Sequence, residues 1–100
     1  MIVNTADLKG SALDWAVAKC EGIDLPHGLT DAVRYSTNWC LGGPIIEREK
    51  ITLSPWVNET WGAIKTFQPE KNGPTPLIAA MRCYVSEKMG AIVDVPKEFR

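Results

Sequence analysis

Residues 75–90, with the sequence TPLIAAMRCYVSEKMG, form the stretch that decides the fold. Thr75 is a favourable N-cap, and Pro76 stands at the first helical position, which proline prefers. Gly90 is typical of the residue that follows a helix end. One face of the stretch carries Leu77, Met81, Tyr84 and Val85. The pattern therefore predicts a helix over residues 75–89 that packs on a core.

A second helix is predicted over residues 11–21. Ser11 is a suitable N-cap, and Asp14 three residues later is a weak analogue of a capping box. Gly22 follows the expected end of the helix. The helical spacing i, i+3, i+4, i+7 is followed by Leu13, Ala16, Val17 and Cys20. Trp15 lies off this stripe, and we interpret it either as a second contact edge or as a partly exposed platform.

Residues 22–44 differ in character from the two predicted helices. The segment is interrupted by Gly22, Pro26, Gly28, Gly42, Gly43 and Pro44. Connections of this length without regular structure are uncommon in compact domains and are often functional. Tyr35, Trp39 and Leu41 are side chains that can anchor such a segment on a core. We therefore expect a long ordered loop over residues 22–44.

Short strands are expected elsewhere in the chain. Residues 1–3 read as a strand followed by one helical turn, and residues 92–95 read as another strand. Residues 61–67 alternate apolar and other side chains. Residues 44–53 are ambiguous, because strand-like isoleucines flank a charged centre that is either a hairpin turn or one helical turn. The final turn, residues 96–99, brings a phenylalanine towards the core.

Length and composition describe an ordinary globular chain. The 100 residues predict a single domain, and the formal net charge is -1. Hydrophobic residues make up 45% and charged residues 23%, which excludes a disordered, collagen-like or strongly basic chain. Together with the expected elements, these values predict an α+β fold. Its two main helices, residues 11–21 and 75–89, pack on a small antiparallel sheet.

Charge and hydropathy also limit the surroundings in which the chain works. No apolar run approaches the roughly 18–20 residues of a membrane span. Residues 1–7 lack the basic start and apolar run of a secretory signal. Neither half of the sequence has a basic run that attracts phosphates, so charge disfavours a nucleic-acid partner. We expect a cytoplasmic protein without a membrane anchor.

The cysteines do not form a recognisable framework. Cys20, Cys40 and Cys83 are widely separated and include no C-x-x-C pair, which argues against disulfides and against a zinc site. His27 is the sole histidine, and we interpret it as an exposed residue in a turn. We expect three free thiols in a reducing cytoplasm, with no metal and no cofactor.

The segment Gly42-Gly43-Pro44 is a candidate loop site. In a functional interpretation, the glycines let backbone N–H groups approach an anion and Arg48 adds positive charge. In the simpler interpretation, which we favour, the segment is a tight turn with positive φ that leads into a strand.

Four tryptophans are many for a chain of this length, and tryptophan is enriched at binding hot spots. Core packing is favoured for Trp61. For Trp39, which follows Asn38 in the expected loop, binding and packing are equally supported. Arg82 interrupts an apolar helix, either as an interior or interface cation or on a solvated face, and we favour the solvated face.

Carboxylates offer weaker candidates for catalysis. Asp14 is read as a first-turn acid that complements the helix dipole rather than as a catalytic group. Glu47 and Glu49 would share a face of a strand, but no partner nucleophile is visible, so we expect them to face solvent.

Three blocks of the sequence carry a family resemblance. They are GSALDWAVA at residues 10–18, YSTNW at 35–39 followed by GGPIIER at 42–48, and GPTPLIAAMRCYV at 73–85. In this order they resemble the NinX-like proteins of lambdoid phages, over nearly the whole chain. Asn38 departs from the aspartate expected there. The resemblance implies a phage or prophage accessory protein in the cytoplasm of a bacterial host, and it carries over no catalytic residues.

Two functions from different classes follow. The first is a non-enzymatic binding module that docks on a host or phage protein through Trp15, Tyr35, Trp39 and Arg82. The alternative is a small-ligand or nucleotide site, either as a binding protein or as an enzyme, built from Tyr35, Asn38, Trp39, Gly42, Gly43 and Arg48. Stacking on tryptophan and an arginine for phosphate make the alternative chemically reasonable. Exposed aromatic side chains are also compatible with a homodimer.

Overall fold

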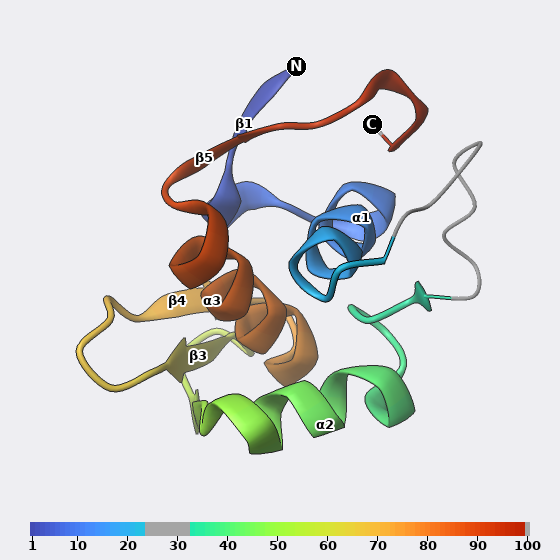
Figure 1. The fold of residues 1–100 in the computed structure, drawn as a ribbon. Helices are drawn as coiled ribbons and strands as arrows, with labels where there is room; N and C mark the ends of the chain where they lie inside the picture. Colours follow the sequence, from blue (N-terminus) through green and yellow to red (C-terminus); the bar gives the residue numbers. More distant parts are fainter. Residues whose placement is uncertain (24–32, 100) are drawn as a thin grey trace.

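Helix α3 (Pro76–Met89) is the element around which the others are arranged (Figure 1). In the computed structural model, which describes residues 1–23 and 33–99, α3 contacts α1, α2 and both groups of strands. The helix begins as predicted, because Thr75 Oγ1 accepts a hydrogen bond from the N–H of Ile78 at 3.1 Å and Pro76 follows the cap. Its buried side chains are those of Leu77, Ala79, Ala80, Met81, Cys83, Tyr84 and Val85.

The described strands form two separate antiparallel groups. Strands β2 (Thr52–Pro55), β3 (Trp61–Ile64) and β4 (Lys71–Gly73) make a three-stranded sheet in that order. Strands β1 (Ile2–Asn4) and β5 (Ile92–Asp94) pair as a ribbon, with Val3 opposite Val93. The small α+β fold is therefore confirmed, with the strands divided between two small sheets rather than gathered in one.

Close approach of β4 to α3 depends on a glycine. A Cβ atom at Gly73 would lie 2.9 Å from the backbone nitrogen of Ala79, which is closer than real Cβ atoms come. The absence of a side chain therefore lets the end of β4 lie directly against the first turns of α3.

Helix α1 (Gly10–Cys20) confirms the second predicted helix with a shifted start. Its N-cap is Lys9, which makes no side-chain cap hydrogen bond, so Ser11 is not the cap. Of the two interpretations of Trp15, the second contact edge is confirmed, because the side chain is buried and its ring stacks on Phe99 at 6.1 Å between centroids. Phe99 belongs to the 3-10 turn η4 (Lys97–Phe99), so the docking of the final turn on the core is also confirmed.

Helix α2 (Trp39–Glu49) replaces part of the expected loop. Residues 1–23 and 33–99 therefore contain three main helices where the sequence predicted two. Its N-cap is Asn38, whose side chain accepts a hydrogen bond from the N–H of Cys40 at 2.9 Å. The helix ends at Lys50, which adopts a left-handed conformation with φ 56°. Residues 24–32 of the expected loop, including His27, lie outside the described residues.

The glycines of α2 lie inside a helix rather than in a tight turn with positive φ, so the favoured turn interpretation is wrong. Gly42 is required by packing: a Cβ atom there would lie 2.5 Å from Leu77 Cδ1 and 2.9 Å from the carbonyl oxygen of Tyr35. Pro44 is accommodated inside the same helix despite its missing N–H. Packing against α3 therefore outweighs the poor helix propensity of this segment.

A short 3-10 turn near the N-terminus is bonded to the residue that follows α3. The 3-10 turn η1 (Thr5–Asp7) follows β1, and Thr5 Oγ1 donates to the carbonyl of Gly90 at 2.8 Å. None of the helices in residues 1–23 and 33–99 has the length and apolar character to cross a bilayer.

Candidate functional site

The first turn of α2 presents an exposed tryptophan beside a hollow. Trp39 is the first residue of the helix, and its side chain is 52% exposed. The hollow has a volume of about 190 Å³. It lies between the segment before α2 and the start of α3, and its walls come from Ser36, Thr37, Trp39, Thr75, Leu77 and Ile78.

A buried hydrogen bond fixes the segment that leads into Trp39. The carboxylate of Asp14 accepts a hydrogen bond from the backbone N–H of Ser36 at 2.9 Å. Burial raises the pKa of Asp14, while the hydrogen bonds from Ser36 oppose that rise. Asp14 lies beyond the first turn of α1, contrary to expectation. Its carboxylate binds the segment before α2 instead of complementing the dipole of α1.

The two helix starts beside the hollow are capped by their own side chains. Asn38 caps the N–H of Cys40, and Thr75 caps the N–H of Ile78. Of the described residues that line the hollow, none has an ionisable side chain. The lining offers hydroxyl groups, an indole and aliphatic carbon, which suit an apolar group with polar neighbours better than an anion.

The structure does not bring all of the predicted site residues to this hollow. Trp15 and Tyr35 are buried, so neither presents an exposed face for docking. Burial also raises the pKa of Tyr35. Gly42 is buried against Leu77 inside α2. Of the aromatic pair Tyr35 and Trp39, only Trp39 is exposed.

Arg48 lies at the far end of α2 from Trp39. Nine residues at 1.5 Å per residue separate the two by about 13 Å along the helix. The Arg48 guanidinium donates to Glu21 at 2.7 Å and to Glu49 at 2.9 Å, and it lies over the ring of Tyr84. These bonds, with Glu21 first, raise the pKa of Arg48 above its usual value. Arg48 is thus engaged by carboxylates, away from the hollow.

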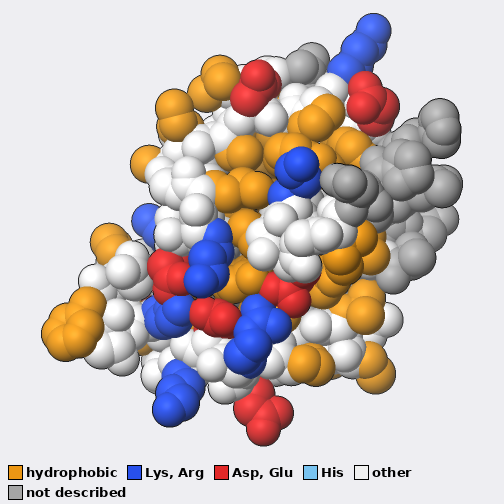
Figure 2. Space-filling view, in the orientation of Figure 1, with side chains coloured by type: hydrophobic (Ala, Val, Ile, Leu, Met, Phe, Trp, Pro, Cys, Tyr) orange, Lys and Arg blue, Asp and Glu red, His pale blue; other side chains and the backbone are white. Residues whose placement is uncertain are grey.

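Sequence reasoning missed the charged cluster that contains Arg48. Lys65 Nζ lies 2.6 Å from Glu49 Oε1 and also pairs with Glu87, which in turn pairs with Lys88 at 3.2 Å. Figure 2 shows acidic and basic side chains alternating over the face where α2 and α3 meet. The cluster joins elements that are far apart in the sequence, so no local spacing could have indicated it.

Glu49 and Tyr84 also belong to this cluster, and Glu49 differs from the expectation that it faces solvent. Glu49 is largely buried rather than solvent-facing, and its bonds from Lys65 and then Arg48 lower its pKa to about 2. The hydroxyl of Tyr84 donates to Glu21 and accepts from Arg48 at 3.2 Å. Burial, followed by the bond to Glu21, raises the pKa of Tyr84.

Arg82 lies between the two alternatives that the sequence left open, because its side chain is partly buried and donates hydrogen bonds to two backbone carbonyls. Its Nε donates to the carbonyl of Leu8 at 2.8 Å, and its Nη1 donates to the carbonyl of Asn72 at 2.9 Å. Partial burial lowers its pKa. The side chain therefore ties α3 to β4 and to the segment before α1.

The three cysteines are free thiols in different surroundings. Cys40 is exposed in the first turn of α2, Cys20 is partly buried and Cys83 is buried. Burial, with Glu21 second, raises the pKa of Cys20 to about 11. Within residues 1–23 and 33–99, no group of His, Cys, Asp and Glu side chains is arranged to hold a metal ion.

Comparison with known proteins places the chain in a family. No curated protein matches it. The family model described as bacteriophage P22, NinX matches residues 4–88, which cover both α1 and α2 and nearly all of α3. Because this match extends over far more than half of the sequence, the chain belongs to the bacteriophage P22 NinX family.

Proposed function

We propose that this NinX family protein is a non-enzymatic binding module that docks on a host or phage protein in the cytoplasm of the bacterial host. The observation that supports the proposal is Trp39, half exposed at the start of α2 beside a hollow of about 190 Å³. Tryptophan is among the residues that dominate the energy of protein interfaces.

The surface around Trp39 is organised before a partner arrives. Asn38 caps the helix that carries the tryptophan, and the bond from Ser36 to Asp14 fixes the preceding segment. A surface that is already ordered loses less conformational entropy on binding. Trp39 is therefore suited to act as a rigid anchor.

The lining of the hollow indicates the chemistry of the partner. Leu77 and Ile78 supply aliphatic walls, and the hydroxyl groups of Thr37 and Thr75 lie among the lining residues. A protein segment that inserts one apolar side chain and offers backbone carbonyls to the hydroxyl groups fits this lining.

The alternative of a small-ligand or nucleotide site has less support. It required Arg48 to meet a phosphate, whereas Arg48 pairs with Glu21 and Glu49 at the other end of α2. The hollow beside Trp39 has the aromatic surface that a nucleotide base would stack on, but the described residues of its lining include no cation to bind a phosphate.

The test compares Trp39→Ala with Trp56→Ala as a matched control. Trp56 is 40% exposed and lies between β2 and β3, so the control removes the same side chain elsewhere on the surface. Tagged chains are recovered from host cells under native conditions, and each captured protein is then purified for direct titration. We expect Trp39→Ala to weaken the complex by at least about tenfold, and Trp56→Ala to leave it unchanged.

A third variant, Thr37→Trp, tests the hollow itself by filling it. Thr37 is exposed, so a larger side chain there does not disturb the core. We expect it to weaken the same complex. A partner that binds wild type, Trp39→Ala and Thr37→Trp equally would show that the docking surface lies elsewhere. Failure to capture any protein that distinguishes wild type from Trp39→Ala would contradict the proposal.

A further inference from the structure

Strand β1 has a free edge on the side away from β5. Two backbone hydrogen bonds of 2.9 Å close the ends of the β1–β5 ribbon, from the N–H of Val95 to the carbonyl of Met1 and from the N–H of Thr5 to the carbonyl of Ala91. Every second residue of an antiparallel strand bonds to its partner, so Val3 bonds towards β5 while Ile2 and Asn4 face away from it. Within residues 1–23 and 33–99, no other strand pairs with β1. The N–H and carbonyl of Ile2 and the N–H of Asn4 therefore point to an open edge.

The edges of the three-stranded sheet offer fewer free groups. The N–H of Trp56 bonds to the carbonyl of Thr60 at 2.8 Å, and the same alternation turns Pro55 to the outer edge of β2. Proline has no N–H to donate there. At β4, the carbonyl of Asn72 already accepts a hydrogen bond from Arg82 at 2.9 Å. Strand β1 contains neither the proline nor the lysine with which proteins protect a strand edge.

A hollow of about 200 Å³ adjoins the free edge of β1. This β1–α1 hollow lies between the strand and helix α1, and the residues that line it are Met1, Val3, Asp7, Leu8, Lys9 and Ala12. None of these lining residues belongs to β5, so the hollow opens on the side of β1 where Ile2 and Asn4 carry their free groups. Most of its surface is apolar.

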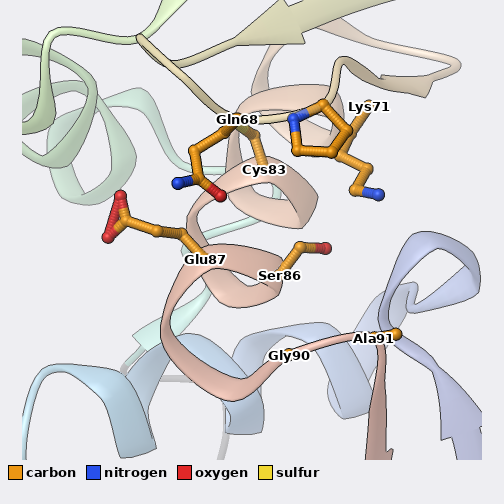
Figure 3. Close-up of a pocket in the computed structure, with 8 residues that line it drawn as sticks. Gln68, Lys71, Cys83, Ser86, Glu87, Gly90 and Ala91 are labelled. Carbon is orange, nitrogen blue, oxygen red and sulfur yellow. The ribbon is translucent and has the colours of Figure 1, made fainter.

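The hollow between the β3–β4 connection and α3 lacks this combination (Figure 3). Its volume is similar, about 170 Å³, but Gln68, Ser86 and Glu87 bring polar atoms into its lining. Strand β4, which contributes to that lining, has one of its carbonyls bonded to Arg82. A free strand edge and an apolar hollow thus meet at β1.

We propose that β1 binds an extended segment of a partner protein, which adds a third strand to the β1–β5 ribbon and inserts one apolar side chain into the β1–α1 hollow. The backbone groups of Ile2 and Asn4 supply the hydrogen bonds, and the hollow selects the side chain. The proposal goes beyond the docking function, because Trp39 takes no part in it. Figure 1 shows β1 and the start of α2 at opposite ends of the molecule.

The edge and the hollow are in register with each other. Val3 lines the hollow and packs on the core, so its side chain lies on the inner face of β1. Neighbouring strands lie about 4.8 Å apart, and side chains alternate between the two faces of a sheet. A residue of an added strand beside Val3 therefore points its side chain into the hollow. On the outer face, Ile2 is 62% exposed and offers an apolar contact to the next residue of that strand.

The size of the hollow suits one apolar side chain. An apolar cavity of about 150 Å³ is large enough to bind benzene, so about 200 Å³ has room for the side chain of a leucine, isoleucine or phenylalanine. Asp7 and Lys9 in the lining carry opposite charges, which favours a segment without a strong net charge. Three strands also form a more stable sheet than two.

A separate segment fits this edge better than a second copy of the chain. Through a two-fold axis, a second copy would offer its own β1 to the edge. The inner side chain of that strand is Val3, which is packed on the core of its own copy. The hollow would then stay unfilled, whereas an extended segment has every side chain free to enter it.

The experiment selects short random peptides from a displayed library on the immobilised complete chain, and titrates the enriched peptides in capped synthetic form. The test variant is Asn4→Pro. The φ of Asn4 is −68°, which proline adopts, and its N–H faces away from β5, so the change removes one edge donor and leaves the ribbon paired. The matched control is Asn4→Ala, which loses the same side chain and keeps the N–H. We expect Asn4→Pro to raise the dissociation constant by about tenfold and Asn4→Ala to leave it unchanged.

The hollow is tested by Ala12→Leu, which fills it from α1. The matched control is Ser11→Leu, which adds the same side chain at the preceding, exposed residue of α1 outside the lining. We expect Ala12→Leu to weaken peptide binding by at least about tenfold and Ser11→Leu to have no effect. In the wild-type complex, amide hydrogen exchange should slow at Ile2 and Asn4. Thermal unfolding of each free variant establishes that it is folded.

The proposal fails if no enriched peptide distinguishes wild type from Asn4→Pro, or if peptides bind without protecting the amides of Ile2 and Asn4. A wild-type dimer that Asn4→Pro abolishes would assign the edge to a second copy instead of a segment. Trp39→Ala should bind the peptides as wild type does. Loss of binding in that variant would place the peptides at the Trp39 surface, so the two proposals are tested separately.

Discussion

The carboxylate of Asp14 and the backbone N–H of Ser36 are joined by a buried hydrogen bond of 2.9 Å. It connects the middle of α1 to the segment just before α2, which leads into Trp39. Because the acceptor is buried, the hydrogen bond is electrostatically stronger than one exposed to water. The position of the proposed docking surface therefore depends on Asp14, a buried residue of α1.

Replacement of Asp14 by alanine is expected to lower the free energy of unfolding by about 1–3 kcal/mol, because the N–H of Ser36 is left buried without an acceptor. Asp14→Asn keeps an acceptor oxygen and nearly the same volume, so it should cost less. Urea unfolding of the two variants measures the difference. Equal losses would contradict the role assigned to the hydrogen bond.

The pH dependence of Asp14→Asn gives an independent check. Because burial raises the folded-state pKa of Asp14 above 3.8, its stabilising contribution is fully present below pH 3.8 and is lost as pH rises through the folded-state pKa. Asp14→Asn lacks this titration. We expect its stability relative to wild type to improve as pH rises through that window. A constant difference would exclude a raised pKa.

Gly42 and Gly43 are neighbours in α2 and are expected to respond to alanine with opposite signs. A Cβ atom at Gly42 meets Leu77 Cδ1 at 2.5 Å and a backbone oxygen of Tyr35 at 2.9 Å, so Gly42→Ala should destabilise by about 1–3 kcal/mol. A Cβ atom at Gly43 would have Trp39 Cε3, at 4.0 Å, as its nearest neighbour. Gly43→Ala should therefore stabilise by about 0.5–1 kcal/mol through helix propensity. Thermal unfolding of both variants tests this pair, and two changes of the same sign would contradict the packing argument.

The sequence predicted those elements whose signals are local. Thr75, Pro76 and Gly90 mark the two ends of α3 by signals that are local in the sequence, and the structure confirms all three. Helix α2 was missed because Gly42, Gly43 and Pro44 disfavour a helix in isolation. What allows it is close packing on Leu77, which is remote in the sequence.

The candidate site shows the same limit. Trp39 and Asn38 could be singled out from the sequence as candidate binding residues, because tryptophan is enriched at binding hot spots. The exposure of Trp39 and the capping role of Asn38 became visible only in the fold. Arg48 could not be placed, since its partner Glu21 lies on another helix. The free edge of β1 could not be predicted either, since it is defined by pairing with β5 at the other end of the sequence.

Acid is expected to weaken the protein through the charged cluster. Hydrogen bonds from Lys65 and then Arg48 lower the pKa of Glu49 from 4.5 to about 2. The stabilisation is therefore present above pH 4.5 and is lost as pH falls towards 2. Urea unfolding across this range should show a shallower loss of stability for Glu49→Gln than for wild type. The same slope in both proteins would show that the Lys65–Glu49 pair does not contribute.

Arg82 provides a test that separates structure from binding. Its guanidinium donates to the carbonyls of Leu8 and Asn72, so Arg82→Ala should lower the free energy of unfolding by about 1–3 kcal/mol. Arg82→Lys keeps the charge but lacks the fork that reaches both carbonyls, so an intermediate loss is expected. The folded fraction of either variant should bind a Trp39-dependent partner with unchanged affinity, as measured by titration below the unfolding transition. Loss of binding without loss of stability would instead place Arg82 in the docking surface, because only direct contact with the partner could produce that combination.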